Sequence, residues 1–318
     1  MIVGENNGPV YQGRDGVLFL SGGRHNIFRL FSDKHPPDSA SIENFVDNVC
    51  HRQRYCAERS SNFKMVVFPD KCVALANLTL EAENLRSVYQ EYYEEPVQER
   101  AGSSSVTYPI NNIRDRLEAF HKTDTHYNAI GNKIVLRDIL DGFFPADQIT
   151  RGLGIIDGCI GRRENYCGDL GAKLSPILTE TASILSSKAV PYDLKTNGMV
   201  GGNDGICDLV ESPKSLSDKT LLIFGDSFFR ALLPMLTVYY RRIIFCRTRF
   251  FHYEMVEALN PDDILCGAAE RYLSNCLSDL DRPHFLSFPL ILERELKPTK
   301  GYSTLWEKFV DRPSLLKT

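Results

Sequence analysis

Short apolar segments alternate with longer amphipathic segments along most of this chain, and no other feature limits the fold as strongly. The apolar segments are rich in Val, Ile and Phe and are too short for helices. They lie at 17–20, 64–68, 221–224, 243–246 and 263–266. Segments of helical character lie at 41–54, 81–94, 110–120, 131–140, 172–187 and 228–239. Strands that alternate with helices predict an α/β fold with a mostly parallel central sheet covered on both faces.

The domain organisation follows from where this alternation ends. A chain of 318 residues is within reach of one large α/β unit with a sizeable core. After Asp281 the pattern weakens and prolines recur. We therefore predict one main domain over 1–280 and a C-terminal extension over 281–318, packed on or beside it. The Gly- and Asn-rich segment 195–213 is expected to be an exposed loop or a short hairpin.

The charge pattern argues against two classes of function. A net charge of −4 provides no global positive field for nucleic acid. The longest apolar stretch, 221–240, is interrupted by Asp226, Arg230 and Pro234, so we expect no transmembrane helix. No basic segment followed by an apolar one opens the chain, so we expect no secretory signal and a cytoplasmic protein. The alternative is a periplasmic protein from which a signal or anchor has been removed.

The nine cysteines have neither an even number nor the two-residue gaps of zinc and redox sites. Free thiols in a reducing cytosol are therefore favoured over a disulfide framework, and no bound metal is expected.

The sharpest local motif lies at 221–230, where an apolar strand meets Gly225, Asp226 and Ser227 before a helix begins. A glycine at such a turn lets a serine hydroxyl stand at the carboxyl edge of the sheet, where α/β folds place active sites. The helix start also leaves unpaired backbone N–H groups beside Ser227, which suit an oxyanion. The motif fits a nucleophile and a plain helix cap equally well.

A nucleophilic serine needs a base. Among the seven histidines, His126 follows an aspartate, Asp124, by two residues. In an extended or looped backbone the two side chains point the same way, so Asp124 would orient the imidazole that takes the proton of Ser227. Taken alone, the pair is also compatible with a capping aspartate and a surface histidine.

Several blocks, taken in order, resemble the SGNH-hydrolase-like alginate O-acetyltransferase family, which modifies bacterial exopolysaccharides. The blocks are Gly13-Arg-Asp-Gly-Val-Leu-Phe19, Val66-Val-Phe-Pro-Asp-Lys71, Lys122-Thr-Asp-Thr-His-Tyr-Asn128, Gly168-Asp-Leu170, Gly225-Asp-Ser-Phe228 and the stretch from Pro261 to Leu273. Val17 and Tyr127 stand where that family has aromatic and Trp residues. The likeness spans roughly residues 10–273, and the acid–base pair precedes the serine as it does in that family.

The resemblance implies a three-layer α/β/α SGNH-like catalytic domain over 1–280, with Ser227, His126 and Asp124 as a catalytic triad. It places Gly225, Asp226 and Phe228 in the nucleophile and oxyanion turn. Further candidate substrate contacts are Asp70, Lys71, Tyr127, Asn128 and Arg230. Asp70 and Lys71 are equally compatible with a turn aspartate and a solvated lysine. Glu270 and Arg271 are expected to form a structural ion pair.

The expected activity is transfer of an acetyl group, through an acyl-serine, onto hydroxyls of a bacterial surface or capsular polysaccharide. No cofactor is expected to be bound permanently. Acetyl-CoA is the expected acyl donor in the cytoplasm, and a membrane acyl-transfer partner is the expected donor for an exported protein. Two alternatives stay open: a carbohydrate acetylesterase with the same triad, and a polysaccharide-binding scaffold without catalysis.

Overall fold

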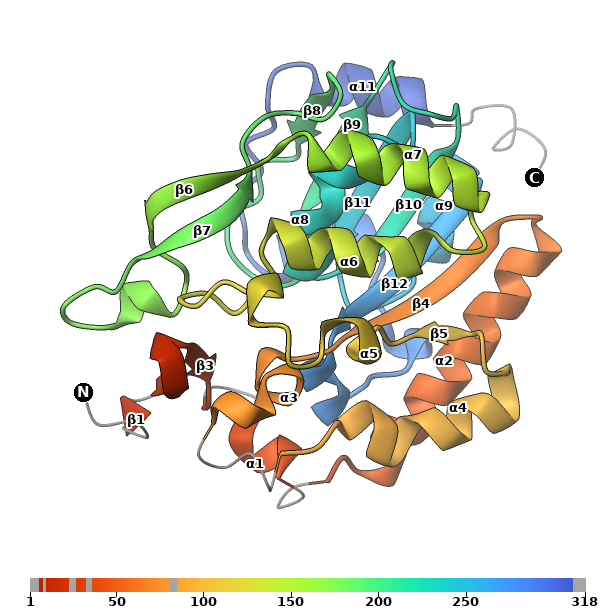
Figure 1. Ribbon diagram of the computed structural model, residues 1–318. Helices are drawn as coiled ribbons and strands as arrows, with labels where there is room; N and C mark the ends of the chain where they lie inside the picture. Colours follow the sequence, from red (N-terminus) through yellow and green to blue (C-terminus); the bar gives the residue numbers. More distant parts are fainter. Residues whose placement is uncertain (1–5, 8–9, 23–26, 33–35, 80–84, 311–318) are drawn as a thin grey trace.

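A computed structural model describes residues 6–7, 10–22, 27–32, 36–79 and 85–310 (Figure 1). Its central sheet has seven strands in the order β5-β4-β12-β10-β11-β9-β8. Their bounds are β5 Val106–Thr107, β4 Asn62–Phe68, β12 Asp263–Ala269, β10 Thr220–Gly225, β11 Arg242–Arg247, β9 Cys207–Glu211 and β8 Asp193–Thr196. The first five are parallel to one another, whereas β9 pairs antiparallel with both β11 and β8. The predicted α/β class with a mostly parallel sheet is confirmed.

Helices contact both faces of this sheet. The longer helices of the main body are α2 Ser39–Glu58, α4 Glu94–Ala101, α6 Ala129–Leu140, α7 Ala146–Asp157, α8 Ser227–Leu236 and α9 Tyr253–Leu259. Lys64 in β4 donates to the carbonyl of Asp138 in α6, whereas its neighbour Met65 accepts from Arg52 in α2. Because successive strand residues face opposite sides, α2 and α6 cover opposite faces. In Figure 1, α6 and α7 cross in front of the strands.

Four of the five expected strands lie in the central sheet, and the fifth does not. The segment 17–20 forms β3 (Leu18–Leu20), which joins β1 (Asn6–Asn7) and β2 (Val10–Gln12) in a separate antiparallel sheet. The Gly- and Asn-rich segment forms the hairpin given as one of its two alternatives, because β8 and β9 pair antiparallel. Its ends lie in β8 and β9, which extend the central sheet, and β9 is almost entirely buried.

Two expected helices are wrong. The segment 172–187 forms a short 3-10 turn, η6 (Gly171–Lys173), and then β7 (Glu180–Leu185), which pairs with β6 (Ile160–Tyr166). Pro176 interrupts this segment and cannot continue a helix. The segment 110–120 is divided into α5 (Ile110–Ile113) and η5 (Leu117–Ala119), because Asp115 between them has a φ of 58°.

The expected helix at 81–94 lies partly outside the described residues, at 81–84. Its remainder forms a π-helical turn, η4 (Tyr89–Tyr93), that leads into α4. The shorter elements of the chain are α1 Ile27–Phe31, α3 Lys71–Ala74, η1 Arg14–Gly16, η2 Ala76–Leu78, η7 Glu270–Ser274 and η8 Asp279–Asp281.

The described part of the segment after Asp281 packs against the main body. It contains η9 (Phe285–Ser287), α10 (Phe288–Ile291) and α11 (Tyr302–Phe309). The rings of Phe285 and Phe288 lie 5.1 and 5.7 Å from that of His252. Residues 311–318 lie outside the described part, and the division at 280/281 stays a prediction.

All nine cysteines are free thiols in the structure. Within the described residues, no helix combines the length and apolarity needed to cross a bilayer.

Candidate active site

Ser227 lies at the carboxyl end of β10 as the first residue of α8. A Cβ on Gly225 would come within 2.4 Å of the Phe229 ring and 2.7 Å of the Gly267 carbonyl, so the turn has room only for glycine. The Asp226 carboxylate accepts from the N–H of Phe228 at 2.9 Å and from the N–H of Ala269 at 2.8 Å. Asp226 therefore caps α8 and links the turn to the end of β12 by hydrogen bonds.

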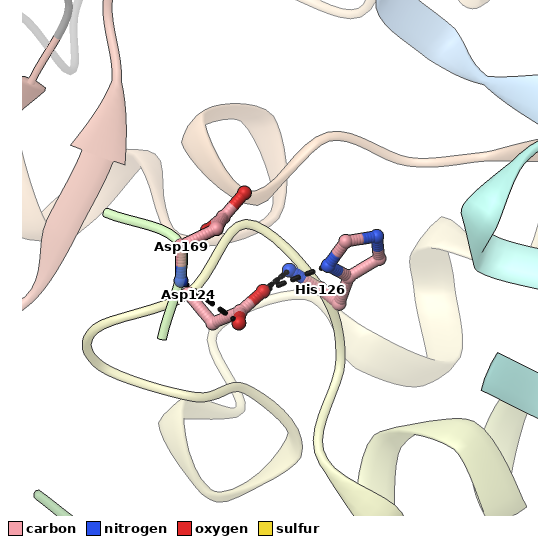
Figure 2. A group of neighbouring side chains, drawn as sticks. All are labelled: Asp124, His126 and Asp169. Atoms are coloured by element: carbon pink, nitrogen blue, oxygen red, sulfur yellow. Dashed lines mark hydrogen bonds and ion pairs between the residues drawn. The ribbon is translucent and has the colours of Figure 1, made fainter. Parts of the chain in front are cut away.

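A chain of hydrogen bonds joins Ser227 to His126 and Asp124. His126 Nε2 lies 2.8 Å from Ser227 Oγ, and His126 Nδ1 lies 2.7 Å from Asp124 Oδ1. Asp124 Oδ1 also accepts from the backbone N–H of His126 at 2.9 Å (Figure 2). Residues 121–128 contain no helix, so the loop that this pairing requires is present. This is the spatial order of nucleophile, base and orienting carboxylate.

The surroundings of Asp124 favour its charged form. Burial alone would raise the pKa of this carboxyl. Hydrogen bonds and charge from His126, with the backbone N–H groups of His126 and Asp169, outweigh burial and hold the pKa below its usual value. Asp124 Oδ2 accepts from the Tyr166 hydroxyl and from the Asp169 N–H, both at 3.1 Å. A charged Asp124 is suited to holding Nδ1–H, which leaves Nε2 free to accept a proton.

Two acidic residues that the sequence prediction missed hold this loop in place. Asp169 accepts from the N–H and hydroxyl of Thr125, both at 2.8 Å. Glu180 of β7 accepts from the N–H of Lys122 at 2.9 Å and of Thr123 at 2.7 Å. The Gly-Asp-Leu block could have identified Asp169 as a site residue. Glu180 had no such signal, because its segment was predicted to be a helix.

The Gly-Asp-Leu block also packs directly on the loop. A Cβ on Gly168 would meet the Thr123 carbonyl at 2.3 Å and the Asp124 Cβ at 2.5 Å, so only glycine permits this approach.

Lys71 is not the solvated lysine of the alternative interpretation, and it does not line the cavity that holds Ser227. Its side chain is buried, and Nζ donates to the carbonyls of Leu18 at 2.8 Å, His121 at 2.5 Å, Lys122 at 3.1 Å and Asp124 at 3.0 Å. Burial lowers the pKa of Lys71 to about 7, although nearby carboxylates favour its charged form. Lys71 thus connects the loop that precedes His126 to strand β3, because it donates hydrogen bonds to backbone carbonyls of both.

Asp70 is likewise buried and does not line the Ser227 cavity. Its carboxylate pairs with the Arg271 guanidinium and accepts from the Arg271 N–H at 2.8 Å. The expected ion pair between Glu270 and Arg271 is therefore wrong, because Arg271 pairs with Asp70 and not with Glu270. Glu270 instead accepts from the hydroxyls of Ser87 and Tyr108, at 2.7 and 2.8 Å, and burial raises its pKa to about 7.

Tyr127 and Asn128 have mainly structural contacts. The Tyr127 hydroxyl donates to the Pro69 carbonyl at 2.7 Å, and its ring packs 5.1 Å from that of Phe228. Asn128 caps α6, because its side-chain oxygen accepts from the N–H of Ile130 at 2.9 Å and of Gly131 at 3.1 Å. The polar atoms of both side chains are therefore already engaged, although Tyr127 lines the Ser227 cavity.

The Ser227 cavity has a volume of about 460 Å³. Its lining includes Ser227 and Arg230 of α8 and residues 183–185 of β7. Arg230 reaches this cavity as expected, and its Nε donates to the buried carboxylate of Asp208 at 2.7 Å. Arg247 at the end of β11 also lines it. Its Nε is buried with no hydrogen-bond partner among the described residues.

Phe228 packs against the base, His126, and its N–H is not available to an oxyanion. Its N–H is used by Asp226, and its ring lies 4.8 Å from that of His126. The N–H of Ser227 belongs to the first turn of α8 and has no acceptor within that helix. Of the two N–H groups, that of Ser227 is therefore the one available to an oxyanion formed next to the serine hydroxyl.

Asp124, His126 and Asp169 also have the spacing of a metal site, with ligand atoms within 4.8 Å of one another (Figure 2). However, His126 Nδ1 is bonded to Asp124, and both oxygens of Asp169 accept from Thr125. A metal ion would have to displace these bonds, so the arrangement fits a hydrogen-bonded relay better.

Comparisons with known proteins show the fold. No protein-family model and no curated protein matches this chain. Bacillus cereus PatB1 with a sulfonyl adduct aligns with a TM-score of 0.57 at 13% identity, over 76% of this chain and 93% of that one. A DHHW family protein from Eubacterium siraeum aligns with a TM-score of 0.53 at 13% identity, over 82% and 90%. The O-acetyltransferase domain of Pseudomonas putida AlgJ aligns with a TM-score of 0.48 at 13% identity, over 94% and 99%. The first two alignments establish a shared fold.

Proposed function

We propose that this chain is a serine-dependent O-acetyltransferase of SGNH-like three-layer architecture that acetylates hydroxyls of a bacterial surface polysaccharide. The observation that carries the proposal is the hydrogen-bond chain from Ser227 through His126 to Asp124, with contacts of 2.8 and 2.7 Å. The block resemblance to exopolysaccharide O-acetyltransferases supports the choice of reaction. The AlgJ structure is described as an O-acetyltransferase domain, although its alignment is too weak to add to this argument.

In the first half of the proposed reaction, His126 Nε2 takes the hydroxyl proton of Ser227 while Oγ attacks the acetyl carbonyl carbon. The Ser227 N–H stabilises the resulting oxyanion, and Asp124 stabilises the imidazolium. The bond between the carbonyl carbon and the leaving group then breaks, and His126 returns its proton to that group. With acetyl-CoA the products are the free thiol and acetyl-Ser227.

In the second half, a sugar hydroxyl gives its proton to His126 and attacks acetyl-Ser227. Collapse of this second tetrahedral intermediate releases the acetylated sugar and restores the Ser227 hydroxyl. A cavity of about 460 Å³ with Arg230 and Arg247 on its walls has room for a sugar beside the nucleophile. The proposal includes acetyl-CoA as donor for a cytoplasmic protein, and a membrane acyl-transfer partner as donor for a periplasmic one.

Transfer and hydrolysis differ in what accepts the acetyl group, so both products should be measured. The protein is incubated with acetyl-CoA, or an activated acetyl ester, and bacterial polysaccharides. Polysaccharide-bound acetate and free acetate are then quantified. We expect ester on the polysaccharide that is absent with Ser227→Ala. Free acetate alone, with acceptor present, would establish the esterase. Acetylation unchanged by Ser227→Ala would rule out Ser227 as the nucleophile, and polysaccharide binding with neither product would favour the scaffold.

The sulfonyl adduct of PatB1 suggests a second probe. A sulfonyl fluoride should modify Ser227 in this chain, because the activated hydroxyl displaces fluoride and forms a stable sulfonate ester. Peptide mass spectrometry would locate the adduct.

A further inference from the structure

A second cavity, of about 450 Å³, lies on the face of the central sheet that α2 covers. Met65 and Val67 of β4 line it together with Phe45 of α2. The next residue of β4, Phe68, packs instead on Phe228 of α8, at a ring distance of 5.4 Å. Because alternate residues of a strand face opposite sides, this cavity and the Ser227 cavity lie on opposite faces of one sheet.

The nucleophile turn separates the two cavities. Gly225 and Asp226 line the second cavity, whereas the following residue, Ser227, lines the first. The side chain of Asn203, in the second cavity, accepts from Arg247 Nη2 at 2.8 Å, and Arg247 lines the first. The second cavity also lies at the carboxyl ends of β10 and β12, where open α/β sheets bind ligands.

Apolar side chains on the sheet and on α2 form one part of the lining of the second cavity, and polar residues such as Asn48, Thr248 and Asn275 form another. Within the apolar part, one buried donor is poorly satisfied. Arg52 is buried, and its Nε and Nη2 donate to Asp279 at 2.7 and 2.8 Å. Its Nη1 donates to the Met65 sulfur at 3.6 Å, and the Cys266 thiol lies near the same guanidinium. Among the described residues, Nη1 therefore bonds no oxygen. Sulfur is a weak acceptor, so an oxygen that entered the cavity would be a better partner.

The Arg52–Asp279 ion pair also determines whether a charged or a neutral ligand binds more favourably in this cavity. Asp279 neutralises the guanidinium through two hydrogen bonds, so a carboxylate bound at Nη1 would gain little attraction. The carboxylate would still lose its hydration on entering an apolar site. A neutral oxygen avoids most of that cost.

We infer that the second cavity binds a small neutral amphiphile: an aliphatic chain lies against Phe45, Val67 and Phe224, and one hydroxyl, ester or ketone oxygen accepts from Arg52 Nη1. The volume falls within the range of small-molecule sites, and an apolar wall with few polar groups is typical of them. The inference concerns a site other than the one that holds Ser227, and it does not depend on the proposed acetyl transfer.

Calorimetric titration of the full chain with octan-1-ol tests the inference, with octanoate as the charged counterpart. We expect saturable one-to-one binding of octan-1-ol, and octanoate weaker by about tenfold or more. Ala268→Phe fills the cavity from β12 and should weaken octan-1-ol binding at least tenfold. The matched control is Ser183→Phe, which fills the Ser227 cavity from β7 and should leave binding within twofold.

Three results would overturn the inference: no saturable binding of octan-1-ol, binding unchanged by Ala268→Phe, or octanoate binding more tightly than octan-1-ol. Circular dichroism of each variant reports whether it is folded, and Val67→Phe replaces Ala268→Phe if the latter is not. Ser227→Ala should bind octan-1-ol normally, which separates this result from any failure of the proposed catalysis.

Discussion

The buried ammonium of Lys71 lies 3.0 Å from the main-chain carbonyl oxygen of Asp124, the residue whose carboxylate holds His126. The same ammonium donates to the carbonyls of His121 and Lys122 and to Leu18 in β3. One side chain thus anchors the segment that carries two of the three proposed catalytic residues. Lys71 does not contact Ser227 or line its cavity, so its role in the proposed reaction is to position the loop.

Replacing Lys71 should therefore weaken catalysis without touching the reacting atoms. We expect Lys71→Met to slow acetylation of Ser227 by about a hundredfold, because displacements near 1 Å in a catalytic site cost that much. The rate constant of labelling by an activated acetyl ester measures the effect. Lys173→Met, at an exposed lysine, is the matched control and should leave the rate unchanged. A normal rate in folded Lys71→Met would contradict the positioning role.

Lys71 also gives stability a predictable dependence on pH. Burial lowers its pKa in the folded chain to about 7, below the ordinary value of 10.5. Between these values the unfolded chain binds more protons than the folded one, so stability rises with pH. The unfolding free energy of the natural chain, minus that of Lys71→Met, should rise from pH 7 to pH 10 by at most about 1.4 kcal/mol per pH unit. Urea unfolding at several pH values measures it, and a difference that falls over this window would refute the lowered pKa.

Asp124→Asn tests the orienting carboxylate. The amide is similar in shape but cannot hold the same tautomer of His126 or stabilise its charge, so we expect the acetylation rate to fall by about 10⁴-fold. The measurement is the same labelling reaction, with Asp147→Asn as control at an exposed aspartate in α7. A loss smaller than about tenfold would mean that Asp124 has no catalytic part.

The buried pair of Asp70 and Arg271 should matter for stability and not for substrate binding. Asp70→Asn leaves the Arg271 charge buried without a counterion, which costs about 3–5 kcal/mol. Glu257→Gln, which breaks the exposed pair with Arg59, should cost less than about 1 kcal/mol. Urea unfolding compares the two variants. Equal losses would show that burial of the Asp70 pair is not decisive.

Local sequence signals mark the three residues of the Ser227–His126–Asp124 hydrogen-bond chain, but not the residues that hold their loop in place. Ser227 follows a strand and a glycine, and Asp124 and His126 are two residues apart, so each has a local signal. The role of Lys71 has no local signal, because its partners are the backbone carbonyls of residues 18, 121, 122 and 124, and no sequence pattern marks a carbonyl. Its burial follows only from the packing of β3 against the loop.

The errors in the predicted fold have the same cause, because contacts between residues far apart in the sequence leave no local signal. The strand at 17–20 has the pattern of a central strand, but its pairing with β2 depends on distant packing. The segment 172–187 has a composition compatible with a helix, yet its second half forms β7 and supplies Glu180 to the loop. Glu180 was missed because that segment was assigned to the wrong kind of element.

Acetylation of Ser227 tests the central claim most directly. The natural chain and its His126→Ala variant are each incubated with acetyl-CoA or an activated acetyl ester, digested, and analysed by peptide mass spectrometry. The contact of 2.8 Å between His126 Nε2 and Ser227 Oγ predicts an acetyl group on Ser227 in the natural chain and its loss in the variant. No label on Ser227 with any donor, or equal labelling in His126→Ala, would contradict the proposed mechanism.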